Sequence, residues 1–137
     1  MQDQKFLKAL ENYDNLKACP VALGFRVLGK KWTIEVIREL FLVHAKFNEI
    51  QKNVPGVNPR MLALRLKELE EMGIIRRAVF STTPVRIEYS LSDLGRDVIP
   101  IMYAMAEFSM KNFPEEVFED GESRTPEKVY REIQFGN

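Results

Sequence analysis

The sequence has 137 residues, 45% of them hydrophobic and 29% charged, and its basic and acidic side chains balance to a formal net charge of zero. This composition is ordinary for a soluble globular protein, and the length suits one domain with a proper core. No run of about 18 apolar residues occurs, which excludes a membrane-spanning helix. The polar N-terminus has no signal-peptide pattern, and a single cysteine excludes an internal disulfide. We therefore expect a reducing, cytoplasmic setting.

The charge is unevenly distributed along the chain. Residues 114–137 carry a net charge of −4, whereas residues 1–113 carry +4. A polyanion responds to the local potential and not to the total, so the neutral sum does not exclude a nucleic-acid partner. We predict two regions, a domain over residues 1–113 and an acidic C-terminal tail with a short helix over residues 114–137.

Three helices are predicted in the first third of the chain. Residues 3–17 have apolar side chains at helical spacing, and such an amphipathic helix can pack on its own core or on a second subunit. Cys19 and Pro20 open a second helix, which ends at Gly29. A third helix is predicted from about Lys31 to Phe41, because its apolar residues form one buried stripe.

The segment from Asn48 to Gly73 predicts a helix-turn-helix. A short helix, with Asn48 as its cap, is expected to end near Asn53, and Pro55-Gly56 is a strong turn signal. The longer helix that follows begins with Asn58, a good N-cap residue, and ends at Gly73. Its inward face carries Leu62, Leu66 and Leu69, and its opposite face carries Arg60, Leu64 and Lys67. We interpret this longer helix as a DNA-recognition helix.

The pattern changes to β between Ile74 and Leu91. β-branched and aromatic residues dominate both halves of this segment, with a loop at Ser81–Pro84. An antiparallel hairpin placed directly after a recognition helix is a wing. Arg77 and Arg86 lie on its adjacent strands.

The C-terminal part is predicted to be helical. Ser92 caps a helix expected to run unbroken from about Asp93 to Phe113, and its apolar surface exceeds what one small core needs, which favours a dimer interface. An acidic surface stretch and a short helix after Thr125 follow. The predicted fold is mainly α with a small β-hairpin: a winged helix-turn-helix with N- and C-terminal helical extensions that form a dimer.

About two-thirds of the chain, from Cys19 to about Ser109, resembles the HxlR-type family of winged-helix transcription regulators. The resemblance implies a dimeric DNA-binding regulator whose first and last helices form the dimer. The matching segments, in the order and spacing of the family, are Cys19-Pro20-Val21, Gly29-Lys30-Lys31-Trp32-Thr33, Arg38-Glu39-Leu40, Lys46-Phe47-Asn48-Glu49-Ile50, Pro55-Gly56-Val57-Asn58-Pro59-Arg60, Leu66-Lys67-Glu68-Leu69-Glu70, and Glu88-Tyr89-Ser90-Leu91 with Gly95.

The expected DNA contacts follow from the outward face of the recognition helix. Ala63 and Leu64 would meet thymine methyl groups, while Arg60 would reach guanine or phosphate. Arg65 lies nearer the core edge, where a phosphate contact and an internal ion pair are equally open interpretations. The full set of candidate DNA-binding residues is Lys30, Asn58, Arg60, Ala63, Leu64, Arg65, Lys67, Arg77 and Arg86. The expected partner is a palindromic operator in double-stranded DNA.

Cys19 has two interpretations. It is either a small, partly buried hydrophobe or a sensor whose thiolate is favoured by the positive end of the helix that follows. The resemblance implies that a cysteine at this position often senses oxidants or electrophiles. With no second cysteine, oxidation would give a cross-subunit disulfide, an adduct or a sulfenic acid.

Other classes of site have little support in the sequence. His44 has no carboxylate or cysteine at ligand spacing, so we expect a turn residue, no metal and no cofactor. The chain lacks a paired acid and base, a nucleophile triad and a glycine-rich phosphate loop, so we expect no enzyme. A small-molecule effector pocket beneath the last long helix stays open. The alternative function is a winged-helix module that binds proteins and not DNA.

Overall fold

The computed structural model describes residues 1–42 and 45–136, so the predicted turn at Val43 and His44 lies outside the described residues. Helices dominate the chain, and one hairpin lies between them. In chain order the elements are α1 (Gln2–Ala9), the 3₁₀ turn η1 (Leu10–Asn12), α2 (Pro20–Leu28), α3 (Thr33–Leu42), α4 (Phe47–Asn53), α5 (Pro59–Glu71), β1 (Ile75–Phe80), β2 (Arg86–Leu91), α6 (Asp93–Arg96), α7 (Ile99–Asn112), α8 (Pro114–Val117) and α9 (Pro126–Phe135).

The hydrophobic core lies where α3, α4 and α5 meet the hairpin. Val36 and Ile37 of α3, Ile50 of α4, and Leu62 and Leu66 of α5 are almost fully removed from water. Each of these helices therefore buries one apolar stripe, which is what the helical period predicts. The core fixes α5 against α3 and leaves the other face of α5 in solvent.

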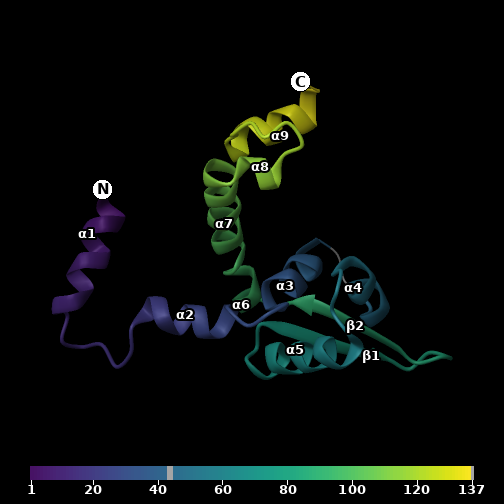
Figure 1. Ribbon diagram of the computed structural model, residues 1–137. Helices are drawn as coiled ribbons and strands as arrows, with labels where there is room; N and C mark the ends of the chain where they lie inside the picture. Colours follow the sequence, from purple (N-terminus) through teal and green to yellow (C-terminus); the bar gives the residue numbers. More distant parts are fainter. Residues whose placement is uncertain (43–44, 137) are drawn as a thin grey trace.

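The hairpin forms the wing of a winged helix. β1 and β2 pair antiparallel in a register that runs from Ile75 opposite Leu91 to Phe80 opposite Arg86. Ala45 forms an isolated β-bridge with β2, because its N–H and C=O both hydrogen-bond to Tyr89. Figure 1 shows the wing extending away from the α3–α5 body, with α1 and α2 reaching out on the other side. The predicted winged helix-turn-helix fold is confirmed.

Three predicted helix boundaries are wrong. The first helix ends at Ala9 and its 3₁₀ turn at Asn12, because the next three residues, Tyr13, Asp14 and Asn15, have low helix propensity. α3 begins at Thr33 and not Lys31, since Trp32 has a positive φ of 78°. Lys46, not Asn48, is the N-cap of α4, and its backbone N–H donates to the Glu49 carboxylate at 3.4 Å.

The long C-terminal helix predicted as continuous is broken into α6 and α7. Pro100 stands at the second position of α7. Proline has no N–H to donate to the carbonyl of Arg96, and its ring clashes with that carbonyl in an unbroken helix. The N–H groups of Asp97 and Val98 bond instead to carbonyls three residues earlier, which tightens the turn.

The start of α6 is fastened to the turn between α5 and β1. The Ser92 hydroxyl accepts a bond from the Gly95 N–H at 3.1 Å and lies within hydrogen-bond distance of the Ile74 carbonyl at 2.9 Å. Gly95 packs so closely on the Ile74 carbonyl oxygen that a Cβ there would overlap it. Ser92 therefore caps the helix as predicted.

The acidic C-terminal region folds back beside α7. The Tyr103 hydroxyl of α7 donates to the Glu127 carboxylate of α9 at 2.9 Å. Within the tail, Arg124 forms ion pairs with Asp120 and Glu132 and stacks on the Phe118 ring at 4.7 Å. The bond from Arg124 is the main reason that the pKa of Asp120 lies well below its ordinary value. The stretch expected as a surface tail thus contains α8 and its own side-chain cluster.

Within residues 1–42 and 45–136, no helix combines the length and the apolar character needed to cross a membrane.

Candidate DNA-binding surface

The start of α5 is set by its own sequence. The Asn58 side chain accepts a hydrogen bond from the Met61 N–H at 2.8 Å, and Pro59 occupies the first turn. Asn58 is the cap that the sequence predicts, and a proline suits the first helical position because no N–H is needed there. The preceding turn needs Gly56, whose φ is +90°. Asn58 therefore caps α5 and is still exposed to solvent at the end of the helix.

The faces of α5 separate as the helical period predicts. Leu62, Leu66 and Leu69 are buried. Arg60, Ala63, Leu64 and Lys67 are exposed on the other side, and 45% of the Leu64 surface is in water. An apolar residue with a basic residue on either side is thus held outward on a helix whose other face is fixed in the core.

Arg65, which is buried, and Lys30, which is half-exposed, both pair with Glu68. The Arg65 residue is only 9% exposed, and its Nε donates to the Lys31 carbonyl at 2.8 Å. Arg65 Nη1 pairs with the Glu68 carboxylate at 3.3 Å, and Lys30 Nζ pairs with the same carboxylate at 3.4 Å. Of the two interpretations of Arg65, the structure favours the internal ion pair. We therefore remove Arg65 from the expected phosphate contacts.

The two wing arginines are not brought together. The strand register pairs Arg77 with Tyr89 and Arg86 with Phe80, which places the two arginines on opposite faces of the hairpin. Arg77 is exposed. Arg86 lies over the Phe80 ring at 4.3 Å and pairs with Glu88 at 3.4 Å. The two side chains would thus meet different parts of any bound surface.

A groove of about 590 Å³ between the start of α4 and the wing loop was missed by the sequence reasoning. Lys46 and Asn48 line one side, and Thr82, Thr83 and Arg86 line the other. The one local signal for Lys46 was its position directly before a short helix. Asn48, expected only as a cap, is free of that role.

Cys19 stands at the N-cap position of α2. Its thiol is exposed, and its side chain makes no cap hydrogen bond. Solvent therefore reaches the sulfur directly, so the interpretation of Cys19 as a partly buried hydrophobe does not fit this position.

A family model described as "HxlR-like helix-turn-helix" matches residues 27–117, about two-thirds of the chain. The chain belongs to this HxlR-like family. A relative from Bacillus subtilis (strain 168), named "Uncharacterized HTH-type transcriptional regulator YybR", is 37% identical over 100 residues, which cover 73% of this chain and 80% of the relative. "HTH-type transcriptional regulator YodB" of the same organism is 40% identical over 78 residues, covering 56% and 70% respectively.

Two solved structures of similar regulators share the fold. The reduced form of YodB from B. subtilis has a TM-score of 0.63 at 33% identity and covers 70% of this chain and 95% of that chain. The redox regulator HypR in its oxidized form has a TM-score of 0.62 at 38% identity, covering 66% and 94%. Together with the helix-turn-helix geometry, these relatives make the chain a DNA-binding transcriptional regulator. The protein-binding module is not favoured.

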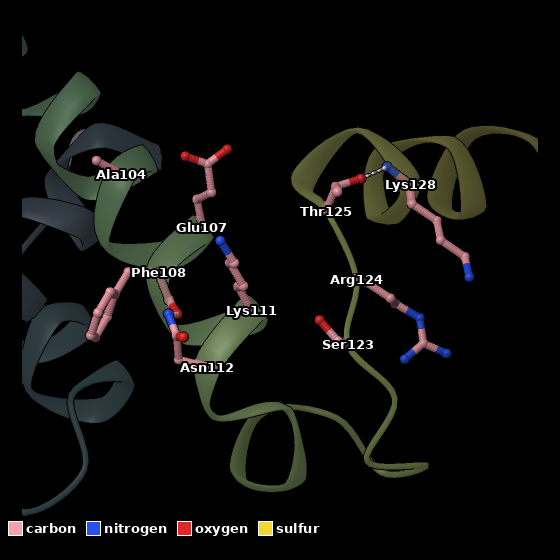
Figure 2. Close-up of a pocket in the computed structure, with 9 residues that line it drawn as sticks. All are labelled: Ala104, Glu107, Phe108, Lys111, Asn112, Ser123, Arg124, Thr125 and Lys128. Carbon is pink, nitrogen blue, oxygen red and sulfur yellow. Dashed lines mark hydrogen bonds between the residues drawn. The ribbon is translucent and has the colours of Figure 1, made fainter. Parts of the chain in front are cut away.

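The HxlR-like match ends at residue 117, so α9 lies outside it. A groove of about 770 Å³ lies between α7 and the segment that leads into α9 (Figure 2). In this view the Arg124 and Lys128 side chains point away from α7, and the Phe108 ring lies on the side of α7 turned away from them. Seven of its nine lining residues are polar or charged, whereas small-molecule pockets are lined mainly by apolar side chains, so we assign no effector to it. The described residues also hold no group of three or more His, Cys, Asp or Glu side chains arranged to bind a metal.

Proposed function

We propose that the chain acts as a homodimer that inserts α5 of each subunit into one of two successive major grooves of a palindromic operator. The observation that carries this proposal is the outer face of α5, where Arg60, Leu64 and Lys67 are exposed on a capped helix with a buried opposite face. Residues near the N-terminus of the second helix contact base edges in this motif. Such a protein meets chromosomal DNA in the cytoplasm.

The proposed roles follow from side-chain chemistry. Leu64 and Ala63 contact thymine methyl groups, Arg60 reads guanine or binds phosphate, and Lys67 binds phosphate. The exposed end of α5 at Asn58 suits a phosphate as well, because a helix N-terminus favours anions.

Outside α5, the proposed contacts are with the DNA backbone. Arg77 and Arg86 reach it from opposite faces of the wing. Lys30, whose side chain is 55% exposed despite its pairing with Glu68, faces a neighbouring phosphate. We add Lys46, because the groove beside the wing loop brings it near Arg86.

The proposed dimer rests on apolar surface that the described chain does not cover. Phe6 and Leu7 of α1, Phe25 of α2, and Met105 and Phe108 of α7 are all exposed. Neither α1 nor α2 contains a buried residue. Monomeric proteins rarely leave so much apolar surface in water, and a second copy of the chain would cover it.

A salt titration tests the assignment of α5. The probe is a duplex that the parent chain selects from a random-sequence library. Because each phosphate contact releases counterions, we expect log affinity to fall linearly with log salt, by about 0.9 per contact. Lys67→Gln should reduce that slope by about one unit, whereas Lys111→Gln on α7 is a matched control that should not change it. A flat response in the parent would reject the phosphate contacts.

We also propose that Cys19 makes the regulator redox-responsive. The support is an exposed, uncapped thiol at the start of α2, together with relatives solved as reduced and diamide-treated YodB and as the redox regulator HypR. In a reaction with diamide, two Cys19 thiols from two chains give up two protons and two electrons. The sulfurs join as a disulfide, and the N=N bond is reduced to a hydrazine.

Operator affinity with and without diamide tests this role of Cys19. The parent should lose affinity on treatment and regain it with dithiothreitol, and Cys19→Ser should not respond. A non-reducing gel separates a cross-subunit disulfide from an adduct or a sulfenic acid. If Cys19→Ser responds as the parent does, the cysteine has no part in the mechanism.

A further inference from the structure

We propose that Arg65 is a positioning residue of the DNA-binding surface, which fastens the recognition helix α5 to the junction between α2 and α3 and so fixes the angle at which α5 meets its groove. The inference rests on the proposed operator arrangement, and it assigns a role to a buried cation that the DNA contacts leave unexplained.

The guanidinium of Arg65 is committed to the protein interior. With 9% of the residue exposed, Nε donates to the Lys31 carbonyl across 34 positions of sequence, and Nη1 donates to both carboxylate oxygens of Glu68 at 3.3 and 3.4 Å. A buried charge with these partners costs free energy to expose, since both hydrogen-bonding groups would be left unpaired. Arg65 therefore acts on DNA through the position of α5.

The junction that Arg65 holds has an unusual backbone. Trp32 adopts a φ of 78°, a left-handed conformation that bulky L residues rarely take. Such a conformation persists only where the surroundings hold it in place. The Lys31 carbonyl bonded to Arg65 belongs to the residue directly before Trp32, so this hydrogen bond acts on the strained peptide itself.

The same junction contacts α5 and the turn that precedes it. Lys30 pairs with Glu68 of α5. The Trp32 ring packs on Gly56, where an added Cβ would lie 3.2 Å from it. Lys31 Nζ lies over that ring at 4.9 Å. One contact region between the end of α2 and the helix-turn-helix is thus formed by Lys30, Lys31 and Trp32. The buried Arg65 side chain links this region to α5 through its bond to the Lys31 carbonyl.

The consequence for DNA binding is geometric. α2 ends at Leu28, two residues before this region, and its exposed apolar face is part of the proposed dimer surface. The angle between α2 and α5 then sets the distance between the two recognition helices of a dimer. Loosening Arg65 should therefore relax the preference for one spacing of operator half-sites, with no loss of a phosphate contact.

The test uses the full chain and a palindromic duplex chosen by the parent from a random-sequence library, remade with one base pair added to or removed from the centre. For Arg65→Met we expect affinity at the chosen spacing to fall about tenfold, and the ratio between spacings to move toward one. The salt slope should stay that of the parent. The matched control is Lys67→Met, which should lower the slope by about one unit and leave the spacing ratio unchanged.

Two other results with Arg65→Met would overturn the positioning role. A slope reduced by about one unit in Arg65→Met would make Arg65 a phosphate contact and overturn the positioning role. An unchanged affinity and spacing ratio would also overturn it. Thermal melting reports whether each variant is folded. If Arg65→Met does not fold, Arg65→Lys and Glu68→Gln take its place. Each keeps most of the buried volume and weakens the contact between Arg65 and Glu68. Both should show the same relaxation in weaker form.

Failure of the operator arrangement is distinguishable from failure of this inference. A parent with no spacing preference would refute the palindromic dimer site. Arg65 is then judged on a single half-site. There, affinity lost at an unchanged salt slope supports the positioning role, and any other result refutes it.

Discussion

Leu64 occupies the outer face of α5 with nearly half of its surface in water, between Arg60 and Lys67. An exposed leucine gives no hydrophobic stabilisation until its apolar surface is covered. The C5 methyl group of thymine is the apolar group that the major groove offers. In the proposed complex, Leu64 is therefore the residue of α5 that we expect to bear most directly on base preference.

Leu64→Ala should weaken binding to the selected duplex by about 1–2 kcal/mol, which is roughly five- to thirty-fold, because most of the apolar contact is lost. The preference for A·T over G·C at one position of each half-site should fall with it. Fluorescence anisotropy with duplexes changed at single positions measures both effects. Equal affinity and equal preference in parent and variant would assign Leu64 to packing alone.

Local patterns predicted the faces of α5, and contacts distant in sequence limited the rest. The Asn58 cap and the three buried leucines follow from spacing within one helix. The role of Arg65 depends on a carbonyl 34 positions away, which no local pattern indicates. Lys46 was missed for a similar reason, because its groove is closed by a wing loop more than 30 residues later. The DNA contacts themselves stay a prediction.

At the scale of elements, the sequence predicted each helix and strand of the winged helix but misplaced several ends. Pro100 was readable from the sequence as a break between α6 and α7, because a proline inside a helical pattern interrupts it. The start of α3 was not readable, since the positive φ of Trp32 is held by tertiary contacts with Gly56 and Arg65. Local residue preferences therefore indicated which segments are helices and strands, but not the ends that tertiary contacts fix.

The junction of α6 with the hairpin should tolerate no added methyl group. In Gly95→Ala the new Cβ would overlap the Ile74 carbonyl oxygen, a backbone atom that cannot turn aside, so we expect a loss of about 1–3 kcal/mol in the free energy of unfolding. Gly24→Ala within α2 is the matched control. No atom lies within 4 Å of its Cβ, and a gain of about 0.5–1 kcal/mol is expected from helix propensity. Urea unfolding followed by circular dichroism measures both, and equal effects would remove the close approach as the cause.

The docking of α9 on α7 should weaken in acid. The bond from Arg124 lowers the pKa of Asp120. The pKa of Glu127 is lowered chiefly by the hydrogen bond from the Glu127 backbone N–H, and next by the bond from the Tyr103 hydroxyl. Groups with a lowered pKa contribute stability above their ordinary value near pH 4, and that contribution is lost as the pH falls below it. Tyr103, whose pKa is raised chiefly by its bond to Glu127, contributes below about pH 10 and loses that contribution above it.

NMR chemical shifts of α9 amides between about pH 6 and pH 2 should therefore follow the titration of these carboxylates. Amides of α5 give the internal reference, since they should move only when the whole domain unfolds. Tyr103→Phe should shift the α9 amides part of the way already at neutral pH. If α9 keeps its shifts while the carboxylates protonate, these bonds do not hold it in place.

At the scale of the whole molecule, the described chain leaves its first two helices without a core of their own. Phe6→Glu should convert the proposed dimer to a monomer, because a charge buried in an apolar interface without a partner is costly. Analytical ultracentrifugation measures the change in mass. Val85→Glu in the wing loop replaces a residue of similar exposure and should leave the mass unchanged. A Phe6→Glu chain that stays dimeric would move the interface away from α1.

Trp32 is the single tryptophan of the sequence, and it stands where the end of α2 meets the turn before α5. Its indole lies against Gly56 and under the Lys31 ammonium, so its emission depends on how those segments sit together. The unlabelled chain therefore carries its own optical reporter at the boundary between the proposed dimer helices and the proposed recognition helix α5. Excitation of this one chromophore would follow that boundary in real time, with no dye attached and no residue replaced.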